Sequence, residues 1–68
     1  MEIQYKIKEI KEFKKDTIYK VLKRYYFFNG SDWRLIGRNG YFTMEGTEFE
    51  TKDKNEAEQF INWCKLND

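Results

Sequence analysis

The chain contains no histidine and no proline, and Cys64 is its only cysteine. Without histidine, the commonest general acid and base at neutral pH is missing. Neither a disulfide framework nor a zinc cage of histidine and cysteine can form within the chain. The four glycines fall at predicted turns or strand ends, so there is no glycine-rich phosphate loop. These absences argue against an enzyme, and we expect no catalytic residue, no resident metal and no cofactor.

Long apolar runs are missing as well. A membrane-spanning helix needs about 20 consecutive apolar residues, which this chain nowhere approaches. The first residues alternate charged and apolar side chains and do not form the apolar segment of a signal peptide. Together with a single unpaired cysteine, this pattern favours a reducing cytoplasm and excludes a membrane partner.

Aromatic side chains are abundant and make up 19% of the 68 residues. A chain of this length is expected to form one domain, here residues 1–68. Such a domain buries only about 60% of the surface that its unfolded chain exposes. The core therefore has to come from aromatic side chains, or from burial against another chain.

The clearest structural pattern runs over residues 25–42, where aromatic-rich runs flank Asn29-Gly30 and Asn39-Gly40. Asn-Gly suits the centre of a type I′ turn, because both residues tolerate a positive φ. The stretch therefore predicts three antiparallel strands joined by two tight turns.

Two earlier segments fit either a strand or a helix by periodicity alone. In residues 2–16, Ile3, Tyr5 and Ile7 alternate as in a strand. We favour a strand, because it would cover the open edge of residues 18–28. That second segment is rich in β-branched and aromatic residues and continues to the first turn without a helix stop signal, so a strand is expected there too.

Residues 54–66 predict an amphipathic helix, and Asp53 and Glu56 at its start have the spacing of a capping box. Its apolar stripe recurs at i, i+3, i+4 and i+7 and consists of Ala57, Phe60, Ile61 and Cys64. The predicted fold class is α+β: a small antiparallel β-meander of three to four strands with one C-terminal amphipathic helix packed on one face.

A two-residue turn at Asn39-Gly40 would place Ile36 opposite Thr43 and Leu35 opposite Met44. Carried back through a four-residue first loop, this register assigns the strand residues to two faces. If the first loop has an odd number of residues, each side chain of residues 18–28 lies on the face opposite to the one assigned here. The face predicted to lie beneath the helix holds Leu22, Tyr26, Phe28, Trp33, Leu35, Phe42 and Met44. The face predicted to stay uncovered holds Val21, Lys23, Tyr25, Phe27, Arg34, Ile36, Arg38 and Tyr41.

An uncovered aromatic face indicates a binding function. Tyr and Arg are enriched at interface hot spots, and an exposed apolar patch usually marks a contact site. We expect a protein partner, held by Tyr25, Phe27, Arg34, Ile36, Arg38 and Tyr41. Two alternatives use the same face. One is single-stranded nucleic acid, which rings interleaved with basic side chains can bind; the other is a second copy of the chain in a homodimer.

Two further features favour structural roles. Cys64 lies on the apolar stripe of the predicted helix and has no candidate base beside it, so we expect a small core residue and not a nucleophile. Glu45, Glu48, Glu50 and Asp53 lack the spacing of a calcium loop, and we expect a solvated edge. In size, composition and missing catalytic set, the chain resembles small phage or mobile-element proteins that bind and inhibit host complexes. That resemblance implies an inhibitor.

Overall fold

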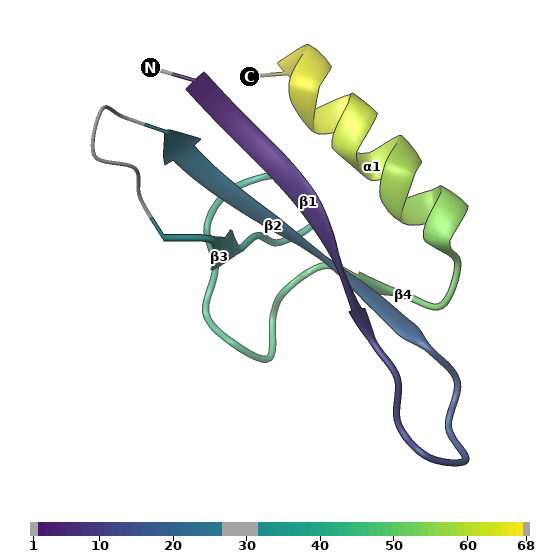
Figure 1. Cartoon of the computed structure of the whole chain (residues 1–68). Helices are drawn as coiled ribbons and strands as arrows, with labels where there is room; N and C mark the ends of the chain where they lie inside the picture. Colours follow the sequence, from purple (N-terminus) through teal and green to yellow (C-terminus); the bar gives the residue numbers. More distant parts are fainter. Residues whose placement is uncertain (1, 27–31, 68) are drawn as a thin grey trace.

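A computed structural model describes residues 2–26 and 32–67. In chain order the elements are β1 (Glu2–Ile10), β2 (Ile18–Tyr26), β3 (Arg34–Leu35), β4 (Glu50–Thr51) and α1 (Lys54–Asn67). The strands form one antiparallel sheet in the order β1-β2-β3, and β4 also pairs with β2 (Figure 1). The predicted α+β class, an antiparallel sheet with a C-terminal helix packed against it, is confirmed. No helix in these two ranges is long and apolar enough to cross a membrane.

The hairpin of β1 and β2 is the longest feature of the fold. Its register runs without interruption from Glu2↔Tyr26 to Ile10↔Ile18. The strand prediction for the start of the chain is therefore confirmed for residues 2–10. The connection begins directly after Ile10, earlier than predicted, and Lys14 within it has a positive φ of 61°.

Helix α1 begins with only half of the predicted capping box. The backbone N–H of Asn55 donates to the Asp53 carboxylate at 2.9 Å, so Asp53 satisfies one of the helix's orphan donors. The Glu56 carboxylate does not accept a hydrogen bond from the Asp53 backbone N–H, which the other half of a capping box requires. That carboxylate accepts from the Thr51 hydroxyl at 3.0 Å, and the same hydroxyl oxygen accepts from the Asp53 N–H at 3.1 Å. Thr51 thus connects β4 to the start of α1.

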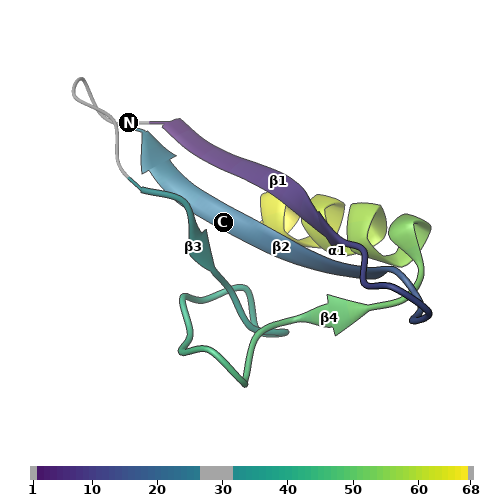
Figure 2. The same ribbon diagram turned by 60° about the horizontal axis from the view of Figure 1, so that its bottom comes forward.

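The core lies between α1 and the face of the sheet that carries the odd-numbered residues of β1 and β2 (Figure 2). The ring of Phe49, just before β4, stacks on Phe60 of α1 with 4.1 Å between centroids. The predicted apolar stripe of the helix does face this core. The buried apolar residues are Val21, Ile36, Phe49, Ala57 and Cys64, and Tyr5, Ile7, Tyr19, Phe42, Phe60 and Ile61 pack against them.

The predicted assignment of faces is wrong. Val21 and Ile36 are 0% exposed and lie beneath the helix, whereas Tyr26 and Met44, predicted to be core, are 42% and 82% exposed. Leu22 does pair with Leu35, so residues predicted to share a face share one. The error concerns which face α1 covers. Phe42 is the exception, since it packs against the core as predicted.

The hairpin at Asn39-Gly40 has a three-residue loop, where the sequence predicts two. The Gly37 N–H donates to the Tyr41 carbonyl at 2.9 Å, and Ile36 pairs with Phe42 in an isolated bridge. The Gly40 N–H donates back to the Gly37 carbonyl at 2.9 Å, and Gly40 has a φ of 84°. A type I turn followed by a left-handed residue is the usual three-residue hairpin loop. The extra residue moves Phe42 to the position predicted for Thr43. The turn predicted at residues 29–30 lies outside the described residues.

Candidate binding surface

The structure does not bring the predicted contact residues together on one open face. Ile36 is buried in the core and cannot contact a partner, so its prediction as an exposed residue is wrong. Tyr25 is half-buried on the helix side of the sheet, with its ring edge-on to Phe42 and 5.5 Å between centroids. Phe27 lies outside the described residues.

The remaining predicted contacts, Arg38, Tyr41 and Arg34, have different surroundings. The Arg38 guanidinium packs over the Phe49 ring at 4.9 Å and donates to the Glu50 carbonyl at 3.4 Å, which ties the second hairpin to β4. Tyr41 is 71% exposed at the tip of that hairpin. Arg34 lies over the Phe42 ring at 5.1 Å. Arg34 and Tyr25 do meet, in a cleft of about 510 Å³ that Asp32, Trp33 and Phe42 also line.

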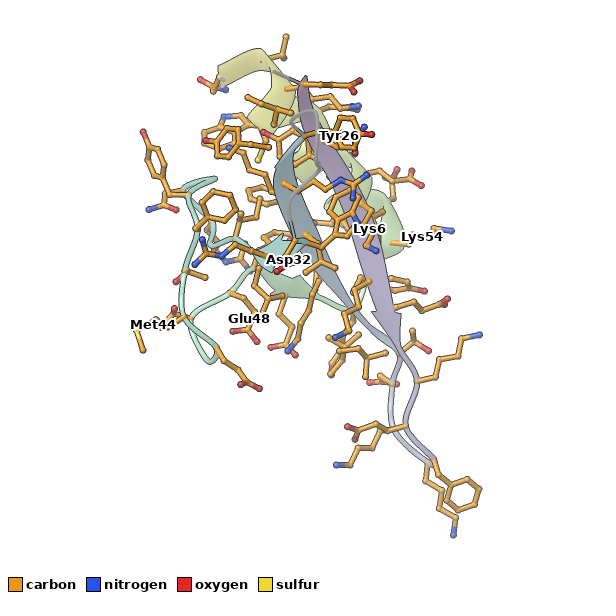
Figure 3. The ribbon with its side chains drawn as sticks, turned by 60° about the vertical axis from the view of Figure 1, so that its left-hand side comes forward. Lys6, Tyr26, Asp32, Met44, Glu48 and Lys54 are labelled. Atoms are coloured by element: carbon orange, nitrogen blue, oxygen red, sulfur yellow. The ribbon has the colours of Figure 1, made fainter. Side chains whose placement is uncertain are left out.

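The face opposite α1 carries a compact group of cations and rings, which we call the Trp33 cluster: Lys6, Arg24, Tyr26 and Trp33. The Arg24 guanidinium lies 4.4 Å from the Trp33 ring centre and 5.0 Å from that of Tyr26. The Lys6 ammonium lies 4.6 Å from the same Trp33 ring. The Arg24 Nε also donates to the Gln4 side chain at 2.7 Å, which fixes its orientation. Figure 3 shows Lys6 and Tyr26 along β1 and β2, with α1 behind the strands.

The cluster has this composition because of the sheet register. Gln4 of β1 pairs with Arg24 of β2, and Lys6 pairs with Leu22, so these even-numbered residues share the face away from the helix. Cations over aromatic faces are attracted by the ring quadrupole, by about 0.5–1 kcal/mol each at exposed sites. The side chains of the cluster therefore hold one another in place.

Charge on this face is mainly positive. Lys20 is neutralised locally, because its ammonium lies 2.6 Å from the Glu48 carboxylate. This hydrogen bond is the main reason that the pKa of Glu48 falls to about 2 and that the pKa of Lys20 is raised. In the described part of the chain, no ion pair involves Lys6, Lys8 or Arg24. These three cations remain available to an acidic partner.

Lys23 is also surrounded by rings, but it is inaccessible. The side chain is on the helix side and the residue is 2% exposed. Its ammonium lies 5.5, 5.3 and 5.8 Å from the ring centres of Tyr5, Tyr25 and Phe42, and it donates to the Gly40 carbonyl at 3.4 Å. This aromatic cage is part of the core and not a surface for a partner.

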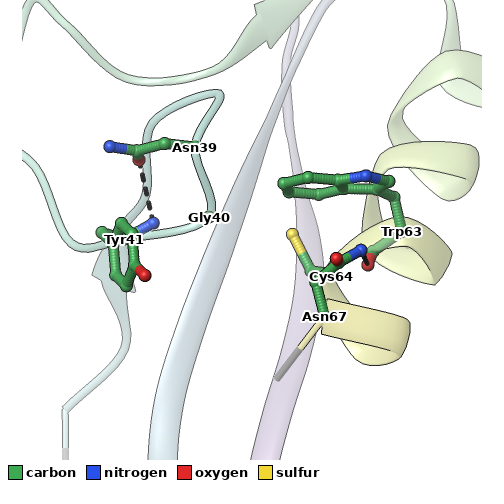
Figure 4. Close-up of a pocket in the computed structure, with 6 residues that line it drawn as sticks. All are labelled: Asn39, Gly40, Tyr41, Trp63, Cys64 and Asn67. Carbon is green, nitrogen blue, oxygen red and sulfur yellow. Dashed lines mark hydrogen bonds between the residues drawn. The ribbon is translucent and has the colours of Figure 1, made fainter.

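A small pocket of about 210 Å³ lies between the second hairpin and the end of α1 (Figure 4). Cys64 lines it but is only 2% exposed, and burial raises the pKa of its thiol. A protonated, buried thiol is a poor nucleophile. The prediction that Cys64 is a core residue is confirmed. Among the described residues, no group of three or more His, Cys, Asp or Glu side chains could hold a metal ion.

Sequence reasoning missed the Trp33 cluster, although a signal for it was present. Once residues 2–10 are read as a strand, Gln4, Lys6 and Lys8 form its polar face. A helix needs an apolar face, so α1 has to cover the opposite side, with Ile3, Tyr5 and Ile7. The same step places Arg24 and Tyr26 on the uncovered face.

Comparison of the chain with models of known protein families, with curated proteins and with solved structures gave no match.

Proposed function

We propose that this protein is a non-enzymatic binding module that holds an acidic surface of a protein partner against the Trp33 cluster. The observation that carries the proposal is the Arg24 guanidinium, which lies over both the Trp33 ring at 4.4 Å and the Tyr26 ring at 5.0 Å. A guanidinium fixed on two rings is already ordered before a partner arrives, so less side-chain entropy is lost on binding.

The residue types of the cluster support a protein partner. Trp, Tyr and Arg are the side chains that most often dominate the energy of protein interfaces. Lys6 and Lys8 extend the positive charge along β1, and both are exposed. Complementary charge steers association and sets orientation, so the partner surface is expected to be acidic.

Single-stranded nucleic acid is the second candidate, because such binders combine aromatic platforms with cations that track phosphates. The Trp33 ring, the best platform for stacking on this face, argues against nucleic acid because it is already occupied. The Trp33 indole already carries Arg24 at 4.4 Å and Lys6 at 4.6 Å. A base that stacked on a ring face occupied by Arg24 or Lys6 would have to displace that cation, whereas an acidic protein surface can contact both cations where they lie.

We extend the proposal to inhibition. A module of 68 residues without a reaction of its own acts on its partner by covering part of that partner's surface. Small phage or mobile-element proteins that occlude host complexes act in this way. Size and composition support this extension; no motif does.

The test uses two labelled probes, a short polyglutamate peptide and a short oligothymidylate, followed by fluorescence anisotropy at low and high salt. Polyglutamate should bind the wild type, and Trp33→Ala or Arg24→Ala should weaken that binding by about tenfold or more. The matched control is Arg38→Ala with Tyr41→Ala, which removes an arginine and an exposed ring elsewhere and should leave binding unchanged.

Two results would contradict the proposal. Equal loss of peptide binding in the control variant would show that only overall charge matters. Tighter binding of oligothymidylate, with an affinity that falls steeply as salt rises, would favour the nucleic-acid candidate.

A further inference from the structure

Strand β1 forms the margin of the sheet. It pairs with β2 along its whole length, and within residues 2–26 and 32–67 no strand pairs with its other side (Figures 1 and 2). The strand contains no proline, and its register with β2 contains no bulge. Proline and bulges are two of the devices by which natural proteins disable edge strands, and β1 has neither.

The hydrogen-bond pattern of β2 with its two neighbours determines which backbone N–H and C=O groups of β1 point to the free edge. The Ile36 N–H donates to the Val21 carbonyl at 3.4 Å, so the polar groups of Val21 point toward β3. Alternate residues of an antiparallel strand point their polar groups to opposite sides. The even-numbered residues of β2 therefore bond to the even-numbered residues of β1, with which they pair. The free side of β1 presents the N–H and C=O groups of Ile3, Tyr5, Ile7 and Glu9.

We propose that two copies of this chain pair through these edges, as antiparallel β1 strands related by a two-fold axis at Tyr5. The charges of β1 select this register. With the axis at Tyr5, Glu2 of each copy lies opposite Lys8 of the other, and Gln4 lies opposite Lys6. Opposite charges directly across two strands stabilise a sheet.

Neighbouring registers either place like charges opposite each other or shorten the paired segment. An axis at Lys6 sets the two Lys6 ammonium groups against each other, and an axis at Ile7 sets Lys6 of each copy opposite Lys8 of the other. Like charges directly across two strands are destabilising. An axis at Gln4 also sets Glu2 of each copy opposite Lys6 of the other, but it shortens the paired segment and leaves Lys8 without a partner strand.

The helix side of β1 also fits this register. Ile3 lies opposite Ile7 of the other copy, and the two Tyr5 residues lie opposite each other. All three residues are only half-buried in the single copy, so pairing covers more of their apolar surface. Small domains with limited cores commonly gain stability by oligomerising.

The symmetry has a consequence for binding. Because odd-numbered residues lie opposite odd-numbered residues, the two-fold axis runs perpendicular to the sheet. Both α1 helices then lie on one face of the doubled sheet, and both Trp33 clusters lie on the other. Dimerisation leaves both clusters uncovered, but it places Lys8, which extends their positive charge, opposite Glu2 of the other copy.

Sedimentation equilibrium tests the proposal by a charge swap. The wild type should dimerise, and Lys8→Glu or Glu2→Lys should each raise the dissociation constant of the dimer by about tenfold or more, because two attractive pairs become repulsive. Combining the two changes should restore the dimer. Lys54→Glu, which makes the same change of charge at the start of α1, should have no effect. All three positions, Glu2, Lys8 and Lys54, are exposed and lie outside the core, and circular dichroism checks that each variant is folded.

Cross-linking tests the register in a Cys64→Ala background. In the proposed dimer, position 4 faces position 6 as a non-hydrogen-bonded pair, whose short Cα separation suits a disulfide. A mixture of Gln4→Cys and Lys6→Cys chains should therefore form a mixed disulfide dimer, and neither chain should cross-link alone. Three results would overturn the proposal: a monomer at all accessible concentrations, a dimer that is lost in Trp33→Ala but not in Lys8→Glu, or a Lys6→Cys chain that cross-links to itself.

Discussion

The ammonium of Lys23 donates a hydrogen bond to the carbonyl oxygen of Gly40 at 3.4 Å, inside the core. This contact joins the middle of β2 to the tip of the second hairpin, where the positive φ of Gly40 turns the chain. The same ammonium lies within 5.8 Å of the centres of three aromatic rings. A charged residue therefore takes the place that an apolar side chain holds in most cores of this size.

The side chain of Lys23 is expected to stabilise the fold mainly through its volume. Lys23→Ala leaves a cavity among the rings of Tyr5, Tyr25 and Phe42 and should lower the free energy of unfolding by about 2–4 kcal/mol. Lys23→Met keeps the length of the side chain and should recover most of this loss. Urea denaturation of both variants measures the difference. If Met is as damaging as Ala, the charge over the rings, and not the volume, supplies the stability.

Ile36 and Trp33 are expected to respond in opposite ways, because α1 covers the face that carries Ile36. Ile36→Ala should lower the free energy of unfolding by about 2–5 kcal/mol, enough to unfold much of a small domain. Ile36→Val is the milder control and should cost about 0.5–1.5 kcal/mol. Trp33→Ala should remain folded while losing the binding surface. Circular dichroism and thermal unfolding check both. An unfolded Trp33→Ala chain beside a stable Ile36→Ala chain would place the helix on the other face.

Most elements could be predicted from the sequence, but the strand expected after Asn39-Gly40 forms only the isolated bridge at Phe42, and α1 covers the face opposite to the predicted one. The alternation of Ile3, Tyr5 and Ile7 and the stripe on residues 54–66 are local patterns, and local patterns identify strands and helices. Alternation also shows which residues share a face, as Leu22 and Leu35 do. In residues 18–28 and 33–44 it does not show which face a helix covers, because aromatic side chains occur on both faces; the polar face of residues 2–10 is the signal that does.

The candidate site was missed for two related reasons. Arg38 and Ile36 were assigned to the open face because the face of the whole sheet was reversed. The second hairpin adds one residue to its loop, and a shift of one residue moves side chains to the opposite face. That shift brought Phe42, and not Thr43, opposite Ile36. The choice between a two-residue and a three-residue loop depends on the left-handed conformation of Gly40, which Asn39-Gly40 permits in both.

Cys64 is expected to be unreactive in the folded protein. Burial raises the pKa of its thiol, so the fraction present as the reactive thiolate is lower than for an exposed cysteine at the same pH. Labelling with a thiol-specific reagent at mildly alkaline pH should be slow in buffer and fast in urea. Fast labelling of the folded chain would mean that the end of α1 opens readily. Cys64→Ala is the blank for the assay.

The contact between Lys20 and Glu48 is expected to make the free energy of unfolding depend on pH in the acidic range. In the folded chain the pKa of Glu48 lies at about 2, below its ordinary value of 4.5, because its carboxylate accepts hydrogen bonds from Lys20 and from the Gly46 N–H. A carboxyl whose pKa is lowered by folding contributes stability above its unfolded pKa and loses it as the pH falls through its folded pKa. The contribution should be complete above about pH 5 and should disappear between pH 4.5 and pH 2.

Urea denaturation of the wild type and of Glu48→Gln across this pH range tests the expectation. The difference in free energy of unfolding between them should shrink steadily as the pH falls toward 2, because the protonated Glu48 then resembles glutamine. Added salt should reduce the difference at neutral pH, since it screens charges near the surface. Lys20→Met should flatten the pH dependence in the same way, and adding it to Glu48→Gln should change the pH dependence no further. A difference that stays constant from neutral pH to pH 2 would show that this pair does not couple folding to protonation.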